Sequence, residues 1–244
     1  MGVAADAQTC DSPGVRYLLA GWLVLSVVVL AGWDSSTNAS PNGEASKTPT
    51  QIIRDVKAAV ANAKAAHIFG SGTSGGTKLT LDLHLVAGQG GAGRISTGGL
   101  GFQIVRIGGK AYFEGNKAFL THYAGATAAQ LFLGKWFEAS AKTGDFASFT
   151  PLTSLAQLTD GIFSGYGKLE VGKTTTVHGQ PAIPLIDTTK GGTLYVAATG
   201  PPYPLELVEG KGKTGSIQFQ NWNKHVTLAV PKHSIDYAKL VGKK

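Results

Sequence analysis

TKLTLDLHL, residues 77–85, is the stretch of sequence that decides the fold. Its leucines occupy every second position and alternate with lysine, threonine, aspartate and histidine. A strict period of two predicts a β-strand with one apolar face and one polar face. Asp82 and His84 fall on the polar face, and we interpret them as solvated side chains rather than as a catalytic pair.

Short apolar segments of the same kind recur along the chain, separated by turns rich in glycine and asparagine. Such segments predict an antiparallel meander of β-strands. We predict further strands over 100–107, 110–113, 118–123, 168–171, 174–177, 182–187, 193–198, 205–209, 216–222 and 226–230.

Three helices are predicted among these strands. The first begins at Pro49 and runs for about four turns to Ala65-Ala66-His67, because Thr48 and Gln51 form a capping box and apolar residues follow at helical spacing. Apolar residues between 128 and 137 favour a second helix, and those from Pro151 to Phe163 favour a third. The predicted fold class is therefore α+β and β-dominated, with a large curved antiparallel sheet, a half-barrel, wrapped around a few helices.

Composition and charge exclude several functional classes. The net charge is +7, but the lysines are scattered and there are only four arginines, so we expect no nucleic-acid partner. The only cysteine is Cys10, which leaves the rest of the chain without a disulfide or a reactive thiol. The six histidines have no metal-binding spacing, so neither a metal ion nor a cofactor is expected.

The N-terminal region has the pattern of an export signal. Arg16 precedes the apolar run YLLAGWLVLSVVVLAG, residues 17–32, and a polar stretch follows. The run is also near the lower length limit for a membrane-spanning helix. We predict a signal or anchor segment over 1–33, a disordered linker over 34–47 and one domain over 48–244. The folded domain is expected on the extracytoplasmic side, associated with the cell membrane or released into the envelope.

Three segments match the sequence patterns of catalytic or nucleotide-binding motifs but lack the flanking secondary structure that these motifs require. GKLEVGKT, residues 167–174, matches a phosphate-binding loop, yet β-branched residues follow where a helix is required, so we predict a hairpin. GQGGAG, residues 88–93, matches the dinucleotide fingerprint but reads as a glycine-rich hairpin loop. GTSGG, residues 72–76, would make Ser74 a nucleophile with Asp187 and His225, and we interpret it as a loop. No enzymatic activity is predicted.

Several segments, in this order, resemble a known family. They are Leu30-Ala31-Gly32, which resembles the start of a lipobox, then GGKAYFEGN (108–116), KWFEAS (135–140), VHGQPAIPLID (177–187) and GGTLYVAATGPPYPLEL (191–207). Over residues 48–240 the chain is similar to the LppX/LprG-type lipoproteins of actinobacteria, which are related to the LolA/LolB lipoprotein carriers. The chain departs from that family at Trp33, where the lipidated cysteine would stand. Residues 1–33 are therefore a retained helix, a cleaved signal or a degenerate lipobox.

The resemblance implies a monomeric, non-enzymatic, membrane-associated carrier that binds a lipid or another acylated molecule in an apolar cavity. By strand parity, the candidates for the cavity wall are Leu81, Leu83, Phe102, Ile104, Leu194, Val196, Ile217 and Phe219, and those for a helical plug are Phe132, Leu133 and Trp136. The same residues would also fill a solid core. The alternatives are therefore an adhesion or sensor module with a filled core and, less favoured, an envelope hydrolase that uses Ser74.

Overall fold

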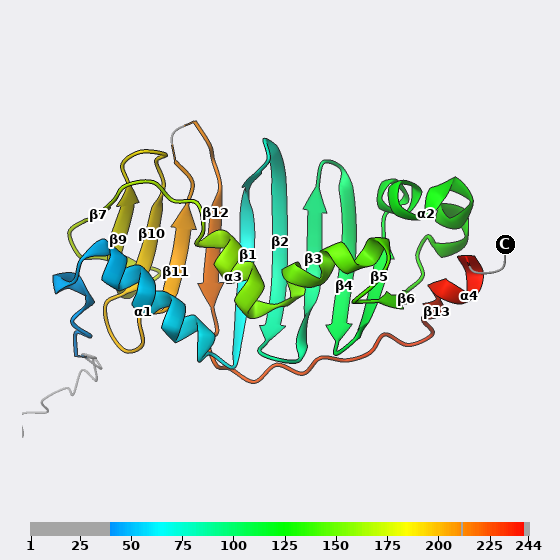
Figure 1. Ribbon diagram of the computed structural model, residues 1–244, viewed down its shortest axis with the longest axis horizontal. Coiled ribbons are helices and arrows are strands. Elements are labelled where there is room, and N and C mark those ends of the chain that lie inside the picture. Colours follow the sequence, from blue (N-terminus) through cyan, green and yellow to red (C-terminus); the bar gives the residue numbers. More distant parts are fainter. Residues whose placement is uncertain (1–39, 211, 242–244) are drawn as a thin grey trace, which may run out of the picture. The chain divides into compact units, whose positions relative to one another are not determined.

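The computed structural model describes residues 40–210 and 212–241 (Figure 1). The predicted signal or anchor segment lies outside the described residues and stays a prediction. Among the helices of the described residues, none is both long enough and apolar enough to cross a membrane.

A single sheet of thirteen strands dominates the described residues (Figure 1). The strands are β1 Ala65–Ser74, β2 Thr77–Val86, β3 Gly90–Thr97, β4 Leu100–Ile107, β5 Lys110–Gly115, β6 Phe137–Ser140, β7 Leu169–Val171, β8 Thr175–Val177, β9 Gln180–Asp187, β10 Thr193–Ala197, β11 Pro204–Val208, β12 Ser216–Gln220 and β13 Ile235–Asp236. Their order is β13-β6-β5-β4-β3-β2-β1-β12-β11-β10-β9-β7, and β8 also pairs with β9. The predicted β-dominated class, with a large open curved sheet and a few helices, is confirmed.

The sheet consists of two meanders that meet at one seam. β1 to β6 form the first meander and β9 to β12 the second, each by pairing strands that are neighbours in sequence. The seam is the antiparallel pair β1–β12, in which His67 lies opposite Gln220. After β12 the chain runs along the ends of the strands to β13, whose pairing with β6 is parallel (Figure 1).

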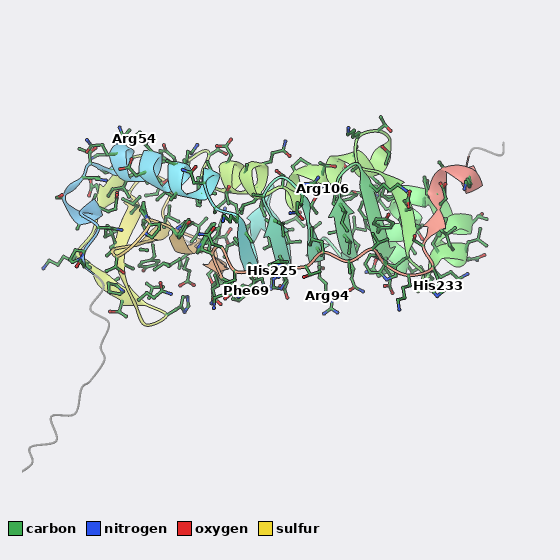
Figure 2. The ribbon with its side chains drawn as sticks, turned by 90° about the horizontal axis from the view of Figure 1, so that it is seen from below. Arg54, Phe69, Arg94, Arg106, His225 and His233 are labelled. Atoms are coloured by element: carbon green, nitrogen blue, oxygen red, sulfur yellow. The ribbon has the colours of Figure 1, made fainter. Side chains whose placement is uncertain are left out.

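Helices cover one face of the sheet and leave the other open (Figures 1 and 2). The α-helices are α1 Pro49–Ala61, α2 Lys117–Phe132, α3 Leu155–Ile162 and α4 Tyr237–Val241, and the 3-10 helices are η1 Glu44–Ser46 and η2 Asp145–Thr153. α1, α3 and η2 lie across the sheet in that order from the β9 side to the β5 side (Figure 1). The predicted capping box of α1 is confirmed: Thr48 accepts from the Gln51 amide, and Gln51 accepts from the Thr48 amide.

The core lies between these helices and the sheet. Leu81, Leu83 and Leu85 are all at most 3% exposed, whereas Asp82 and His84 between them point outward, as the alternation predicts. Arg106 fixes η2 over this face, because its Nε donates to Thr153 Oγ1 (2.7 Å) and its Nη2 donates to the Thr153 carbonyl (2.9 Å). Burial lowers the pKa of the Arg106 guanidinium.

Several predicted elements were wrong. The first helix ends at Ala61, so Ala65-Ala66-His67 begins β1, and residues 72–74 are its end rather than a loop. Residues 118–123 belong to α2, not to a strand, because the Asn116 side chain caps a helix by accepting from the Phe119 amide (2.8 Å). Residues 226–230 form no strand. The predicted hairpin of β7 and β8 is also wrong, since both strands pair with β9 instead.

The described part of the predicted linker makes specific contacts. Pro41 forms a β-bridge with Thr199, and the Asn42 side chain donates to the carbonyls of Ala197 (2.9 Å) and Gly200 (3.0 Å). Glu44 is 3% exposed and accepts from Lys47 (2.6 Å). Residues 41–47 thus differ from the disordered linker expected over 34–47, because the Asn42 side chain satisfies backbone carbonyls at the end of β10.

Candidate functional site

The predicted cavity residues divide into two groups. The eight strand residues lie in the buried core of the helix-covered face, each at most 8% exposed: Leu81, Leu83, Phe102, Ile104, Leu194, Val196, Ile217 and Phe219. The predicted plug does not form one unit, since Phe132 is buried, Trp136 is half-buried and Leu133 is 52% exposed. Leu133, with Leu81 and Phe102, instead lines an open groove of about 670 Å³ at the ends of β2 to β5.

An apolar cavity of about 230 Å³ lies between the helices and the second meander. Ile53 from α1 and Phe163, which follows α3, close it on the helical side, and Leu185, Leu194 and Leu207 form its floor on β9, β10 and β11. α1 brings Ile53 here because its apolar residues share one face, with Ile52 and Val56 fully buried. Of the predicted residues, only Leu194 lines this cavity.

A second cavity, of about 370 Å³, lies between α1 and α3. Val60, Ala61, Ala156 and Phe163 give it a mostly apolar lining, and it opens to solvent because Ala61 and Ala156 are exposed. Phe163, itself 4% exposed, lines both cavities. The ion pair between Lys57 Nζ on α1 and Asp160 Oδ1 on α3 (2.8 Å) stands at its rim. Both partners of this pair are exposed.

The mouth of the first cavity is polar. Asp187, Lys190, Glu209 and Lys213 line it beside the apolar residues. Asp187 is 8% exposed, and its carboxylate accepts from the amides of Gly167 (2.6 Å), Thr189 (2.9 Å) and Lys190 (2.8 Å). Desolvation raises the pKa of Asp187, but these three hydrogen bonds and the Lys190 charge outweigh it, so the pKa lies below its usual value.

Sequence reasoning missed the helical half of both cavities. Ile53, Val60 and Phe163 were assigned to helix faces without a role in a site. Their apolar spacing was a visible signal, but the same spacing describes any helix that covers a sheet. Which apolar side chains border empty space depends on how neighbouring elements fit together, and no periodicity in the sequence carries that information.

The three motif matches have no catalytic context. Lys173 and Thr174 stand between β7 and β8 with no helix after them, and GQGGAG runs directly into β3. Ser74 is the last residue of β1, and β2 follows after a two-residue turn, so a strand stands where the nucleophile elbow needs a helix. The Asp187 carboxylate is engaged by the backbone amides described above.

A polar cluster that the sequence analysis did not anticipate lies on the opposite, open face. Pairing of β1 with β2 brings His67 next to His84, and Asp82 joins them. His67 Nε2 lies 2.7 Å from Asp82 Oδ1. No histidine motif marks this cluster, because its members come from two strands whose register only the fold defines.

Comparisons with known proteins give no family assignment: no family model and no curated protein matches the chain. Among solved structures, LprF from Mycobacterium bovis is similar at 14% identity and a TM-score of 0.48, covering 79% of this chain and 99% of that one. An uncharacterized conserved protein from Thermus thermophilus shares 12% identity at a TM-score of 0.36, covering 78% and 98%. A DUF1329 family protein from Desulfovibrio piger shares 9% identity at a TM-score of 0.23, covering 74% of this chain and 94% of that one.

Proposed function

We propose that the chain is an extracytoplasmic, membrane-associated carrier that binds a lipid or another acylated molecule and catalyses no reaction. The observation that supports this proposal best is the pair of largely apolar cavities that share Phe163, one against β9 to β11 and one open to solvent between α1 and α3. Moving one acyl CH₂ group out of water is favourable by about 0.8 kcal/mol, so an acyl chain needs a continuous apolar enclosure when it leaves a membrane.

The acyl chain would lie between α1, α3 and the floor formed by β9 to β11. Each cavity alone is at or below the lower end of the range of about 300–1,000 Å³ that is typical of ligand sites. Rotation of the Phe163 ring would join them into one channel with Ile53 and Val60 on its helical side. We infer that Phe163 is the gate of this channel.

α3 is the element best suited to move. It has only eight residues, and an exposed ion pair connects it to α1. An exposed pair of this kind contributes at most about 1 kcal/mol, so breaking it costs little. The polar mouth with Lys190 and Lys213 would hold the head group of the lipid in contact with solvent.

The proposed location rests on the sequence. The apolar run 17–32 behind Arg16 would export the chain or anchor it, and the domain would follow the linker as a monomer at the membrane. Because Trp33 stands where a lipidated cysteine would be needed, we propose attachment through the apolar run itself, or none after cleavage.

A second candidate function is an envelope adhesion or sensor module with a filled core. The first meander favours it, because aromatic rings fill the space under η2: Phe102 and Phe119 stack at 4.5 Å between centroids, and Phe113 and Phe146 lie 4.9 Å apart. The two candidates differ in whether the space around Phe163 accepts an acyl chain.

A fluorescent fatty acid tests the proposal on the full chain in mild detergent. Ala156→Phe places a ring in the cavity between α1 and α3, whereas Ala58→Phe places the same ring on an exposed position of α1 that lines neither cavity. We expect binding by the wild type, at least about tenfold weaker binding by Ala156→Phe, which corresponds to about 1.4 kcal/mol, and no more than about a twofold change for Ala58→Phe.

Absence of binding by the wild type, together with native mass spectra free of any extractable cargo, would overturn the carrier proposal in favour of the filled-core module. Equal weakening by both variants would show that the acyl chain binds elsewhere. Native mass spectrometry of the chain purified from an actinobacterial host, followed by organic extraction, would identify the cargo.

A further inference from the structure

The open face of the sheet carries three metal-ligating side chains that the carrier function does not use. His67 on β1 and His84 on β2 are direct cross-strand partners, and Asp82 is two residues from His84 on the same face. Phe69 is the cross-strand partner of Asp82, so His67, Phe69, Asp82 and His84 form a square of four corners on this face. Figure 2 shows Phe69 on the side of the sheet away from the helices. The pairing of β1 with β2 over ten residues fixes the backbone positions of all four corners.

The donor atoms of the three side chains converge. One ligand atom from each residue lies within 4.8 Å of those of the other two, and His67 Nε2 is 2.7 Å from Asp82 Oδ1. Zinc binds imidazole nitrogen and carboxylate oxygen at about 2.0–2.2 Å, so neighbouring donors around it stand about 3.4 Å apart. Side-chain rotations must therefore bring the donor atoms from within 4.8 Å to about 3.4 Å of one another before all three can bond one ion.

The two imidazoles lie side by side in an aromatic stack, and at least one ring must tilt out of it for both to bind one ion, because a metal is bound in the plane of the imidazole ring. The rings of His67 and His84 are nearly parallel, at 9° and 4.1 Å between centroids, and Phe69 stacks on His67 at 4.6 Å. Desolvation by burial, and then the nearby His67, lower the pKa of His84, while Asp82 opposes the shift.

The strands that flank β1 and β2, which are β12 and β3, place one charged side chain beside the three residues. On β12, the partner of His67 is the neutral Gln220, and on β3 the partner of His84 is Ala92. Arg94 on β3 is the partner of Asp82 and lies on the same open face (Figure 2). Its positive charge opposes a bound cation, so the Arg94→Gln variant is expected to bind metal more tightly than the parent.

We propose that His67, Asp82 and His84 form a site for a divalent transition-metal ion, with Zn²⁺ as the probe. Imidazole nitrogen suits Zn²⁺, Cu²⁺ and Ni²⁺, and two histidines with one carboxylate leave coordination positions free for water or for an external ligand. The site is open to solvent because Asp82 and His84 are exposed. It is therefore a surface metal site that can take a ligand from outside.

Calorimetric titration of the full chain with Zn²⁺ tests the proposal. The Cys10→Ser variant in mild detergent serves as the parent, since it removes the only thiol that would compete for zinc. We expect one saturable equivalent of Zn²⁺, and at least about a tenfold loss of affinity in His84→Gln and in Asp82→Asn. His122→Gln, which changes an exposed histidine on α2, is the matched control and should bind as the parent does.

Saturation that is lost in both ligand variants but kept in His122→Gln supports the site, provided that circular dichroism shows all variants folded. No saturation up to about 1 mM Zn²⁺ in the parent overturns it. Equal affinity in His84→Gln and the parent overturns it as well.

Discussion

At the residue scale, Asp187 illustrates how one buried carboxylate organises the mouth of the first cavity. Its two oxygens accept from three backbone amides across the turn that joins β9 to β10 and the segment before β7. The carboxylate thus replaces the ladder hydrogen bonds that these amides lack where the strands end. The position of Lys190 at the mouth follows from this turn.

Replacing Asp187 by asparagine should lower the free energy of unfolding at pH 7 by about 1–2 kcal/mol, because hydrogen bonds to a charged acceptor are lost. The pKa of Asp187 lies below its unfolded value of 3.8, so its contribution is complete above that pH and is lost as pH falls through the folded pKa. Urea unfolding of both proteins between about pH 7 and pH 2.5 measures this. The difference should be constant down to about pH 4 and then shrink, and a difference that grew on acidification would contradict the assignment.

At the element scale, α3 is the cover of the proposed channel. Its attachment to α1 includes the exposed pair of Lys57 and Asp160, and its buried side contributes Leu155 and Leu158 to the core. Burial of Leu155 and Leu158 holds α3 against the core, whereas the exposed ion pair adds only a weak interaction at the rim of the second cavity. A carrier needs such a cover, since an acyl chain enters only while the apolar lining is open.

The Lys57→Gln variant should therefore bind a fluorescent fatty acid faster than the wild type while losing less than about 1 kcal/mol of stability. Stopped-flow fluorescence gives the association rate, and urea unfolding gives the stability. Lys64→Gln, at an exposed residue outside both cavity linings, is the control. Unchanged association in Lys57→Gln would mean that α3 does not limit entry.

The comparison of predicted with observed elements shows which information the sequence carries. Alternation at 79–85 predicted β2 because one face is buried and the other is solvated. Residues 118–123 were assigned to a strand because the glycine and asparagine before them are typical of a tight turn, yet the Asn116 side chain caps a helix there. Residues 226–230 alternate too, but the chain runs along the ends of the strands, where no partner is available for a ladder.

The candidate sites were less predictable than the strands. Strand parity identified the buried face, including Leu194, but not the empty space beside it, which depends on Ile53 and Phe163 from distant elements. The His67 cluster was equally hidden, since His67 was assigned to the end of a helix and only the β1–β2 register brings it to His84.

At the scale of the whole described domain, the two meanders differ in what they enclose. The first meander packs aromatic rings beneath η2, whereas the second borders the two apolar cavities. The seam between β1 and β12 joins them, and at Gly70 the backbones approach so closely that an added Cβ would overlap the Ser216 carbonyl oxygen. Gly70 also has φ of 136°, which side chains avoid.

Gly70→Ala should therefore destabilise the protein by about 3 kcal/mol or more, because it strains the backbone and separates the seam. Gly161→Ala is the matched control: a Cβ at this position in α3 meets no atom within 4 Å, and stability should rise by about 0.5–1 kcal/mol. Thermal unfolding of the two variants and the wild type measures both stability changes. Equal stability of Gly70→Ala and the wild type would exclude a close approach at the seam.

The seam also has a consequence for the order in which the chain folds. β1 to β5 and β9 to β12 are each joined by short connections, whereas α2 stands between β5 and β6, so these strands can pair early at a small cost in chain entropy. β1 and β12, by contrast, bring residues 67 and 220 together, and contacts between such distant positions slow folding. We therefore expect the two meanders to form before β1 and β12 pair, so that docking at the seam is the slow step in folding of the domain.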